Sequence, residues 1–295
     1  IKAQEKRMEK EYQELTKIPE TEDAIFIRFG EKISVPNGKR ILEFYREQLC
    51  TGERVLASQI QLTVIGPEHI GIIGKNGAGK TTLIREIWKE LKHRQDIRVF
   101  YMPQNYEEYL DIKKTPIAFL AESGEKEEIS RVRTYLGSMK YTAEEMSHPL
   151  GELSGGQKQR VSLAGVMVEE VKVLLFDEPL ANLDPAAGRM TIELIDTVHE
   201  RTGAAVIIIE HRLEDVLWRS MDRIVLMNEG KIIADMPTAK LLAGSLLLEH
   251  GIREPLYLTA LRYAKVAIGE AMHPEHVERL ALSDAQKETV RSWYQ

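Results

Sequence analysis

The sequence has almost no cysteine and no long apolar run. Its single cysteine, Cys50, excludes an internal disulfide bond and a cysteine-based metal cage, which fits a reducing compartment. The longest apolar runs, such as residues 204–209, are far shorter than the roughly 18 residues or more that a membrane span requires. There is also no secretory signal at the start. We therefore expect a cytoplasmic chain with no direct membrane insertion, which attaches to a membrane only through a partner.

The composition predicts a folded, globular chain. At 295 residues, of which 43% are apolar, it can bury a substantial core. The net charge of -6 gives no broad attraction to nucleic acid, although a local basic face is compatible with it. The first residue is Ile1 rather than methionine, so we expect a start that was cut from a longer chain or is incomplete. Residues 1–17, rich in lysine and glutamate, indicate a linker-like charged helix.

A glycine-rich stretch, GIIGKNGAGKTTLI at residues 71–84, indicates a phosphate-binding loop. It matches the pattern G-x-x-x-x-G-K-[ST] at Gly74, Gly79, Lys80 and Thr81. Glycines let backbone N–H groups converge on phosphates, and a helix start adds its positive dipole end. Lys80 would reach the β- and γ-phosphates, and the Thr81 hydroxyl would hold Mg²⁺. The other expected contacts of this loop with a nucleotide are Asn76, Gly77 and Thr82.

The flanks of this stretch have the required structure. The apolar run His69–Ile73 predicts a buried strand, and Thr81–Leu91 predicts a helix with its apolar residues on one side. Strand, glycine loop and helix in this order are the context that phosphate binding demands. Upstream, residues 24–66 predict short antiparallel strands, with turns at residues 36–38 and 50–52.

A second site element is an apolar strand that ends in two acids. Residues 173–176 are apolar and are followed by Asp177 and Glu178. Such a strand delivers its last side chains to the edge of a parallel sheet, where open α/β folds bind ligands. Asp177 can therefore support Mg²⁺, and Glu178 can orient or deprotonate an attacking water. Together with the phosphate loop, the pattern predicts a magnesium-dependent nucleotide hydrolase.

Between these two elements lies the string LSGGQ at residues 153–157, which resembles the signature of ATP-binding-cassette (ABC) ATPases. Its residues open a predicted helix, so hydroxyl and N–H groups would form an anion site. The resemblance implies that this site holds the γ-phosphate of a nucleotide bound to the other cassette of a head-to-tail dimer. The residues assigned to it are Ser154, Gly155, Gly156 and Gln157.

Other motifs of the ABC family occur in order around this string. Gln104, in MPQN, matches the glutamine that senses Mg²⁺ and water. Asp184, in ANLD, matches the aspartate that crosses the dimer interface, and His211 matches the switch histidine that contacts the γ-phosphate. The resemblance covers roughly residues 50–235. It implies catalytic roles for Glu178, His211 and Gln104, and a metal site formed by Thr81, Gln104 and Asp177.

The resemblance implies an α/β fold: a P-loop NTPase of ABC type with an antiparallel β-subdomain. We expect the nucleotide-binding domain at residues 24–235, a helical insertion at about 106–150, and an accessory helical region at 236–295, which includes a Leu-rich helical stretch at 239–248. One family feature is missing, because residues 49–51 hold no aromatic side chain to stack on adenine. Tyr45 is the nearest aromatic residue, and the stacking residue stays open.

The two halves of the chain resemble different ABC branches. The first half, including residues 99–151, resembles the second cassette of ABC-F proteins, soluble ATPases that act on ribosomes. From about Gln157 onward, the strings DEPLANLD and IIIEHRLEDVL resemble the ATPase subunits of energy-coupling-factor (ECF) importers. The change falls at the shared LSGGQ string. Recombination, an engineered fusion and an assembly error all remain open as its origin.

Two functions from different classes follow. The preferred one is the motor subunit of an importer, located at the inner face of the cell membrane and bound to transmembrane transporter subunits. The single cassette, the acidic net charge and the C-terminal resemblance favour it. The alternative is a soluble factor that acts on the ribosome, which the region after Gln104 favours. A cassette that only binds nucleotide is disfavoured, because Glu178 and His211 are both present.

Overall fold

The computed structural model describes residues 35–121, 123–168, 171–181 and 183–294 of the chain. The predicted charged helix at residues 1–17 lies outside these ranges, as do residues 24–34 of the predicted β-rich stretch. The described part combines α-helices with a six-stranded mixed sheet and a two-stranded antiparallel hairpin. This is the α/β arrangement that the sequence predicts.

The six-stranded sheet carries the candidate site at its centre. Its strand order is β4 (Val99–Met102), β5 (Val173–Asp177), β6 (Ala205–Ile209), β3 (His69–Gly74), β7 (Arg223–Asn228) and β8 (Lys231–Pro237). Neighbouring strands are parallel except β7 and β8. Strands β3, β5 and β6 are buried at every residue, because helices or strands cover both sheet faces. Strand β8 continues past the predicted domain boundary near Asp235.

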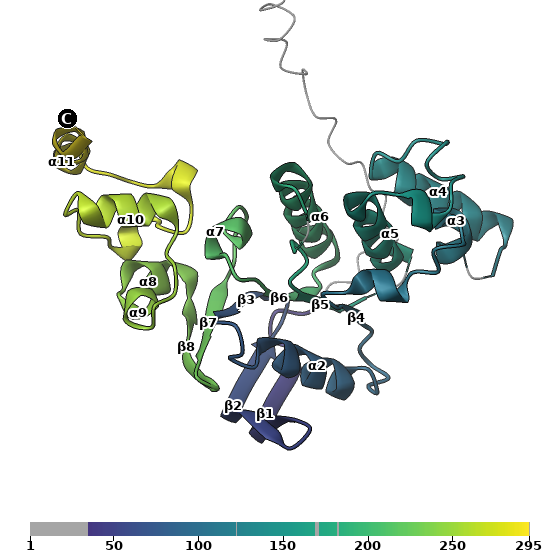
Figure 1. The fold of residues 1–295 in the computed structure, drawn as a ribbon, viewed down its shortest axis with the longest axis horizontal. Coiled ribbons are helices and arrows are strands. Elements are labelled where there is room, and N and C mark those ends of the chain that lie inside the picture. The colour runs from purple at the N-terminus through teal and green to yellow at the C-terminus, as the bar shows by residue number, and fades with distance from the viewer. Residues whose placement is uncertain (1–34, 122, 169–170, 182, 295) are drawn as a thin grey trace, which may run out of the picture.

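Two hydrophobic cores lie on the two faces of this sheet. Along β6, Val206 and Ile208 point into one core, whereas Ala205, Ile207 and Ile209 point into the other. The second core is closed by α2 (Lys80–Leu91) and the hairpin. The first is closed by α5 (Gly155–Val168), α6 (Pro185–Thr202) and α7 (Leu213–Val216), which lie on the opposite side of the sheet in Figure 1.

The antiparallel hairpin differs from the short strands that the sequence predicts. It consists of β1 (Arg40–Thr51) and β2 (Arg54–Ile65), each 12 residues long. Their turn uses Gly52, whose φ of +60° is left-handed and suits glycine. The predicted turn at residues 36–38 precedes β1. Buried apolar residues such as Phe44, Ile60 and Leu62 recur between exposed or half-buried ones along both strands, as expected for strands with one face on the core.

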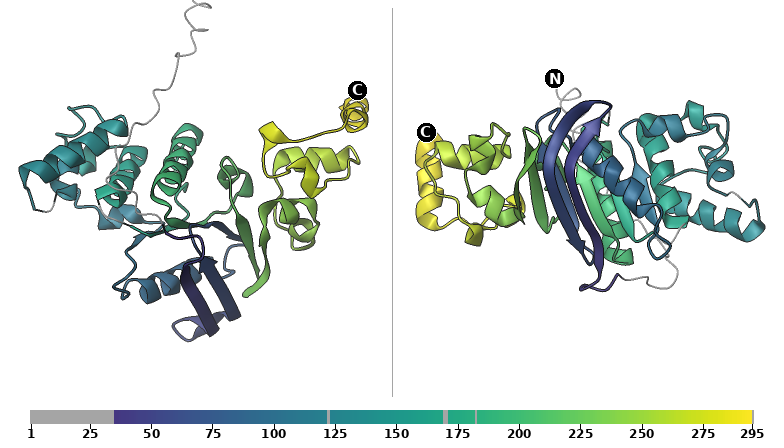
Figure 2. Two further views of the ribbon diagram at one scale, coloured as in Figure 1. Left: turned by 180° about the vertical axis from the view of Figure 1, so that it is seen from behind. Right: turned by 90° about the horizontal axis from the view of Figure 1, so that it is seen from below.

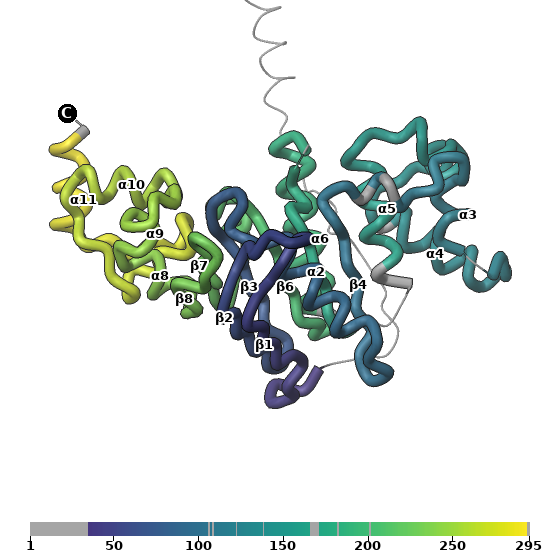
Figure 3. The backbone as a smooth tube through the Cα atoms, turned by 60° about the horizontal axis from the view of Figure 1, so that its bottom comes forward, coloured from purple at the N-terminus to yellow at the C-terminus, as the bar shows by residue number. Residues whose placement is uncertain are grey.

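The helical insertion lies at one end of the molecule and the C-terminal helices at the other (Figures 2 and 3). The insertion contains η1 (Tyr106–Tyr109), α3 (Pro116–Leu120), α4 (Lys126–Ser138) and η2 (Leu150–Glu152). The C-terminal region contains α8 (Thr238–Ala243), α9 (Leu246–Glu249), α10 (Leu256–Tyr263), η3 (Glu270–Met272), η4 (Val277–Arg279) and α11 (Asp284–Tyr294). The stretch 239–248, which the sequence predicts to be helical, is therefore interrupted at Gly244 and Ser245. Among the described residues, no helix is long and apolar enough to cross a membrane.

Candidate active site

The loop between β3 and α2 has the tight backbone that its glycines predict. Gly74 lies so close to β7 that a Cβ atom there would be 2.1 Å from the Met227 carbonyl oxygen. Gly79 has a left-handed φ of +97° and immediately precedes Lys80, the first residue of α2. The loop therefore ends at a helix N-terminus, where N–H groups and the helix dipole favour an anion.

Lys80 is held at this loop by backbone oxygens. Its Nζ donates to the carbonyl oxygens of Gly74 at 2.8 Å and Lys75 at 3.2 Å. Burial lowers the pKa of Lys80, while the carboxylates of Glu178 and Asp177 act in the opposite direction. The ammonium group therefore stands at the phosphate loop without a direct ion pair to either carboxylate within the described residues.

The two predicted metal ligands Thr81 and Asp177 are in direct contact. The Thr81 hydroxyl donates to Asp177 Oδ1 at 2.9 Å, although the two residues come from α2 and β5. On its other side, Asp177 Oδ2 accepts a longer hydrogen bond, of 3.4 Å, from the Tyr101 hydroxyl. Burial raises the pKa of Asp177, because its charged form is removed from water.

Glu178 lies between the other two predicted catalytic residues. Its Oε2 accepts a 2.9 Å hydrogen bond from Gln104 Nε2, and its Oε1 lies 2.7 Å from His211 Nε2. These residues follow the adjacent strands β4, β5 and β6, whose carboxyl ends meet at one sheet edge. The φ of Glu178 is +55°, which is uncommon for a residue with a side chain. The three side chains that the resemblance brings together are thus in contact.

A cavity of about 330 Å³ joins these residues to the phosphate loop. Among the residues predicted to bind nucleotide or to act in catalysis, its walls include Gln104, Glu178 and His211. The phosphate loop contributes Asn76, Gly77, Gly79, Lys80, Thr81 and Thr82. The remaining lining residue, Leu56 of β2, was not predicted from the sequence.

The LSGGQ residues form a helix start away from this cavity. Ser154 N donates to Gln157 Oε1 at 2.7 Å, and Gln157 N donates to Ser154 Oγ at 3.3 Å, so the two residues cap α5 reciprocally. Gly155 and Gly156 form the first turn of the same helix. Asp184 caps α6 by accepting from the N–H groups of Ala186 and Ala187. None of these predicted residues lines the cavity at Lys80.

The end of β1 at the hairpin turn lies beside the phosphate loop, whereas the aromatic residue Tyr45 lies farther back along β1. Thr51 Oγ1 lies 3.5 Å from Thr82 Oγ1, which places the end of β1 at the start of α2. Tyr45 lies on the same strand, about 20 Å from Thr51 at about 3.3 Å per residue. It is 59% exposed and does not line the cavity. Tyr45 therefore lies away from the cavity at the phosphate loop, and among the described residues the structure singles out no aromatic residue for stacking on adenine.

Three residues at the site were not predicted from the sequence. Leu56 and Tyr101 are brought to the site by strand pairing, which a linear motif does not reveal. Glu210 directly precedes His211 and is only 5% exposed, so it is a buried acid beside the site. Its signal in the sequence was an acid at the end of the apolar strand, the same pattern that identified Asp177 and Glu178.

Two family models match the chain. The model described as "ABC transporter" matches residues 57–181, which include the phosphate loop, the LSGGQ string and the end of β5. The model described as "ATP-binding cassette cobalt transporter" matches residues 244–295 in the C-terminal region.

Two curated relatives are similar over 87% and 48% of this chain. A Clostridium perfringens protein named as an ABC transporter ATP-binding protein is 39% identical over 285 residues, covering 87% of this chain and 50% of the relative. A Vibrio parahaemolyticus protein named in the same way is 56% identical over 143 residues, covering 48% of this chain and 24% of the relative. The chain thus spans half or less of the length of these relatives.

Solved structures with the same fold are ABC cassettes. A nucleotide-free ATP-binding cassette from an ABC transporter has a TM-score of 0.61 at 22% identity, covering 73% of this chain and 100% of that one. The dimeric ABC transporter cassette MJ0796 has a TM-score of 0.56 at 19% identity, covering 65% and 96%. These likenesses confirm the predicted fold. The family model at residues 57–181 and the relatives show that the chain contains an ATPase cassette of the ABC transporter type.

Proposed function

We propose that this cassette hydrolyses ATP with Mg²⁺ to drive an importer of the energy-coupling-factor type. The observation that carries the hydrolytic part is the position of Glu178, between Gln104 and His211 at the wall of the cavity that Lys80 lines. The importer part is supported by the resemblance from Gln157 onward and by the cobalt-transporter model that matches residues 244–295.

The residues around Glu178 can direct the attack of water on the γ-phosphate. Glu178 would accept a proton from the water and orient it, since a carboxylate is suited to both tasks. His211 and Gln104 fix the two oxygens of that carboxylate, so its direction is set before the nucleotide binds. Lys80 would bind the β- and γ-phosphates in place of the carbonyl oxygens that it now contacts.

The donor set beside Lys80 fits magnesium. Thr81 offers a hydroxyl, Asp177 a carboxylate and Gln104 an amide oxygen, and Mg²⁺ prefers oxygen ligands. Within the described ranges there is no cluster of three or more His, Cys, Asp or Glu residues for a metal. Mg²⁺ is usually bound by few protein ligands, and its other ligands are phosphate oxygens and waters. When bound, the ion neutralises charge on the phosphates.

The complete site would need a second cassette, in a homodimer or a heterodimer. Ser154 and Gly156 lie at the start of α5, where the helix dipole favours an anion, yet they do not line the cavity at Lys80. We propose that they bind the γ-phosphate of a nucleotide held by the partner, and that Asp184 lies at the interface. Hydrolysis then depends on closure of the two cassettes around ATP.

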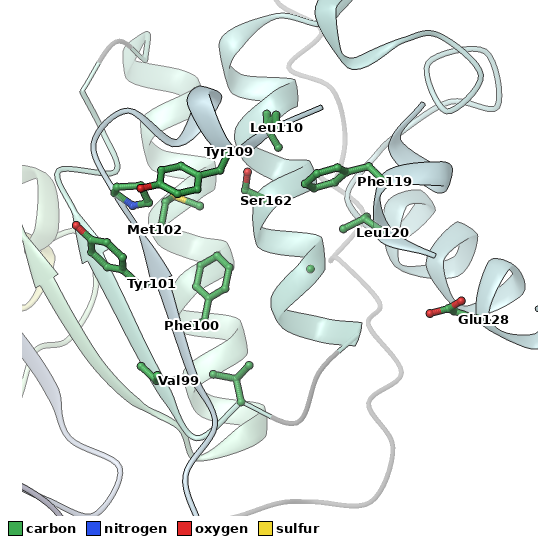
Figure 4. Close-up of a pocket in the computed structure, with 13 residues that line it drawn as sticks. Val99, Phe100, Tyr101, Met102, Tyr109, Leu110, Phe119, Leu120, Glu128 and Ser162 are labelled. Carbon is green, nitrogen blue, oxygen red and sulfur yellow. The ribbon is translucent and has the colours of Figure 1, made fainter. Parts of the chain in front are cut away.

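A membrane-spanning partner would dock beside the helical insertion. A groove of about 560 Å³ separates β4 from α3 and α5, and its walls include Phe100, Tyr109, Phe119 and Ser162 (Figure 4). Pro103 also lines the groove, and the next residue is Gln104. A partner segment in the groove would therefore touch the strand end that carries Gln104. Its movement would reach Glu178 through the 2.9 Å hydrogen bond.

Site-directed crosslinking tests the identity of that partner. In a Cys50→Ser background, Tyr109→Cys places one reactive thiol at the rim of the groove, because Tyr109 is 70% exposed. Tyr263→Cys on α10 is a matched control, since Tyr263 is also 70% exposed but lies at the other end of the molecule. We expect a membrane-spanning protein to crosslink to the Tyr109→Cys chain in the source cells and not to the control.

The same experiment separates the importer from the ribosomal alternative. A ribosomal protein crosslinked through Tyr109→Cys would contradict the importer and favour the ABC-F resemblance of the first half, which stays a prediction. The proposed location at the inner face of the membrane also rests on this result.

The domain boundaries at residues 24–235 and 236–295 are likewise our proposal.

A further inference from the structure

Glu210 is a buried acid that the proposed hydrolysis does not use. It follows the last residue of β6 and precedes His211, and only 5% of it is exposed. Burying a carboxyl group is costly unless its oxygens are hydrogen-bonded. An acid at this position therefore needs a structural or functional reason.

The hydrogen bonds of Glu210 join two segments of the candidate site. Its Oε1 accepts from the backbone N–H of Leu180 at 2.9 Å, and its carboxyl group also accepts from the backbone N–H of His211. Leu180 lies two residues after Glu178, in the segment that follows β5. One carboxyl group thus holds this segment against the one that carries the switch histidine.

A second buried side chain holds the same segment from the opposite side. Gln159 of α5 is fully buried and donates from Nε2 to the carbonyl oxygen of Pro179. Its Oε1 accepts from Thr191 of α6 at 3.4 Å. Pro179 and Leu180 are therefore fixed between the helix that begins with the LSGGQ residues and the segment that follows β6.

The backbone of Glu178 explains why such anchoring matters. Its φ of +55° is a conformation that a non-glycine residue keeps only where its surroundings determine it. Glu178 N donates to the carbonyl oxygen of Ile209 at 3.0 Å, which secures one side of the residue. The bond from Leu180 to Glu210 secures the chain two residues later.

We propose that Glu210 is a positioning residue. It holds the segment after Glu178 against His211 and so keeps the side chains of Glu178 and His211 in contact. This inference rests on the ATPase function proposed above. Burial raises the pKa of Glu210 to about 8, with the nearby negative charge of Glu178 acting in the same direction. A neutral carboxyl group still accepts a hydrogen bond, so a side-chain amide should replace it.

Three substitutions separate positioning from charge. Glu210→Gln keeps an acceptor oxygen for Leu180 N, so we expect kcat within about 3-fold of wild type. Glu210→Leu removes the acceptor, and we expect kcat to fall at least about 10-fold, since a small misplacement of Glu178 is costly. If Glu210→Leu does not fold, Glu210→Asp serves instead, because its shorter side chain withdraws the oxygen from Leu180 N.

The readouts are kcat and the ATP dissociation constant, measured on the full chain. Affinity for ATP should change less than about 3-fold in all three variants, because the phosphate loop is not touched. Asp196→Leu is the control for loss of a buried acid, since Asp196 is 8% exposed and lies on α6 outside the site. It should leave kcat unchanged.

The kcat values of the three Glu210 variants either support or overturn the positioning role of Glu210. Wild-type kcat in Glu210→Leu or Glu210→Asp would overturn the inference, as would an equal loss in Glu210→Gln and Glu210→Leu. Failure of the ATPase function is seen separately, because wild-type protein would then show no turnover that depends on Glu178.

Discussion

His211 Nε2 lies 2.7 Å from Glu178 Oε1, and this contact joins the ends of two neighbouring parallel strands. The same carboxylate is held from the other side by Gln104, which follows β4. Three strand ends therefore fix one acid at the wall of the cavity beside the phosphate loop. The contact makes the role of Glu178 directly testable.

Glu178→Gln should bind ATP with wild-type affinity and lose turnover by about 100-fold or more, because the amide cannot accept a proton from water. Gln104 and the phosphate loop remain in place. Turnover is measured by phosphate release and binding by calorimetry, with Glu152→Gln, a substitution of an exposed residue in η2, as the control. Unchanged phosphate release in Glu178→Gln would remove Glu178 from the reaction.

Lys80→Ala should weaken ATP binding itself. The substitution removes a charge-assisted contact to phosphate of about 1.5–3 kcal/mol, which corresponds to roughly 10- to 100-fold in the dissociation constant. Lys89→Ala is the matched control, since Lys89 lies on the same helix but pairs with Glu86 at the exposed surface. Equal affinities of Lys80→Ala and wild type in calorimetry would refute the phosphate-binding role of Lys80.

Arg262→Ala should destabilise the C-terminal region. The Arg262 Nε atom donates to both carboxylate oxygens of Glu254 at 3.0 Å, and the Glu254 side chain is fully buried. Removing the arginine leaves a buried charge without its partner, which typically costs about 3–5 kcal/mol. Urea unfolding of the variant should show this loss, whereas Lys287→Ala, in an exposed pair, should unfold like wild type. Identical midpoints for all three proteins would show that the ion pair adds no stability.

The free energy of unfolding should fall as the pH is lowered from 6.5 toward 3, because burial lowers the pKa of His69. Burial lowers the pKa of His69 from 6.5 to about 3, and neighbouring His199 acts in the same direction. Between these values the unfolded chain binds one more proton than the folded chain, so the folded state loses stability as pH falls. From pH 6.5 to pH 5 the loss is about 1.6 kcal/mol, because the slope reaches its full value of about 1.4 kcal/mol per pH unit only below pH 6.5.

The variant His69→Phe isolates this contribution. It should unfold in urea with a smaller difference between pH 6.5 and pH 5 than wild type does. His148→Phe is the control, because His148 is exposed. If His69→Phe keeps the full acid sensitivity of wild type, His69 is not its source.

The sequence predicted those parts of the site that are local in the chain. The phosphate loop, with Gly79 before Lys80, could be recognised because strand, loop and helix follow one another directly. The contact between Glu178 and His211 was implied only by the resemblance, since 33 residues separate them and only the pairing of β5 with β6 brings them together. Glu210 was missed for the same reason, because its partner Leu180 lies on another segment.

Two errors in the predicted fold also have physical causes. The strands of the hairpin were expected to be short, but apolar residues that pack on the core recur along both, and their pairing extends from Arg40 and Ile65 to Thr51 and Arg54. The stretch 239–248 was expected to be helical throughout, but Gly244 ends α8. Glycine is a common helix terminator, so Gly244 indicated this break in the sequence. The prediction gave more weight to the leucines on both sides of it.

The most direct test of the account is the ATPase rate of an equal mixture of Lys80→Ala and Ser154→Arg chains. Each variant alone should be nearly inactive, because one lacks the phosphate contact and the other blocks the start of α5. If two cassettes share each site, about half of all dimers in the mixture pair one variant with the other, and each of these has one intact site of two. The mixture should therefore recover roughly a quarter of wild-type turnover. A mixture no more active than the mean of the two separate variants would contradict the shared site.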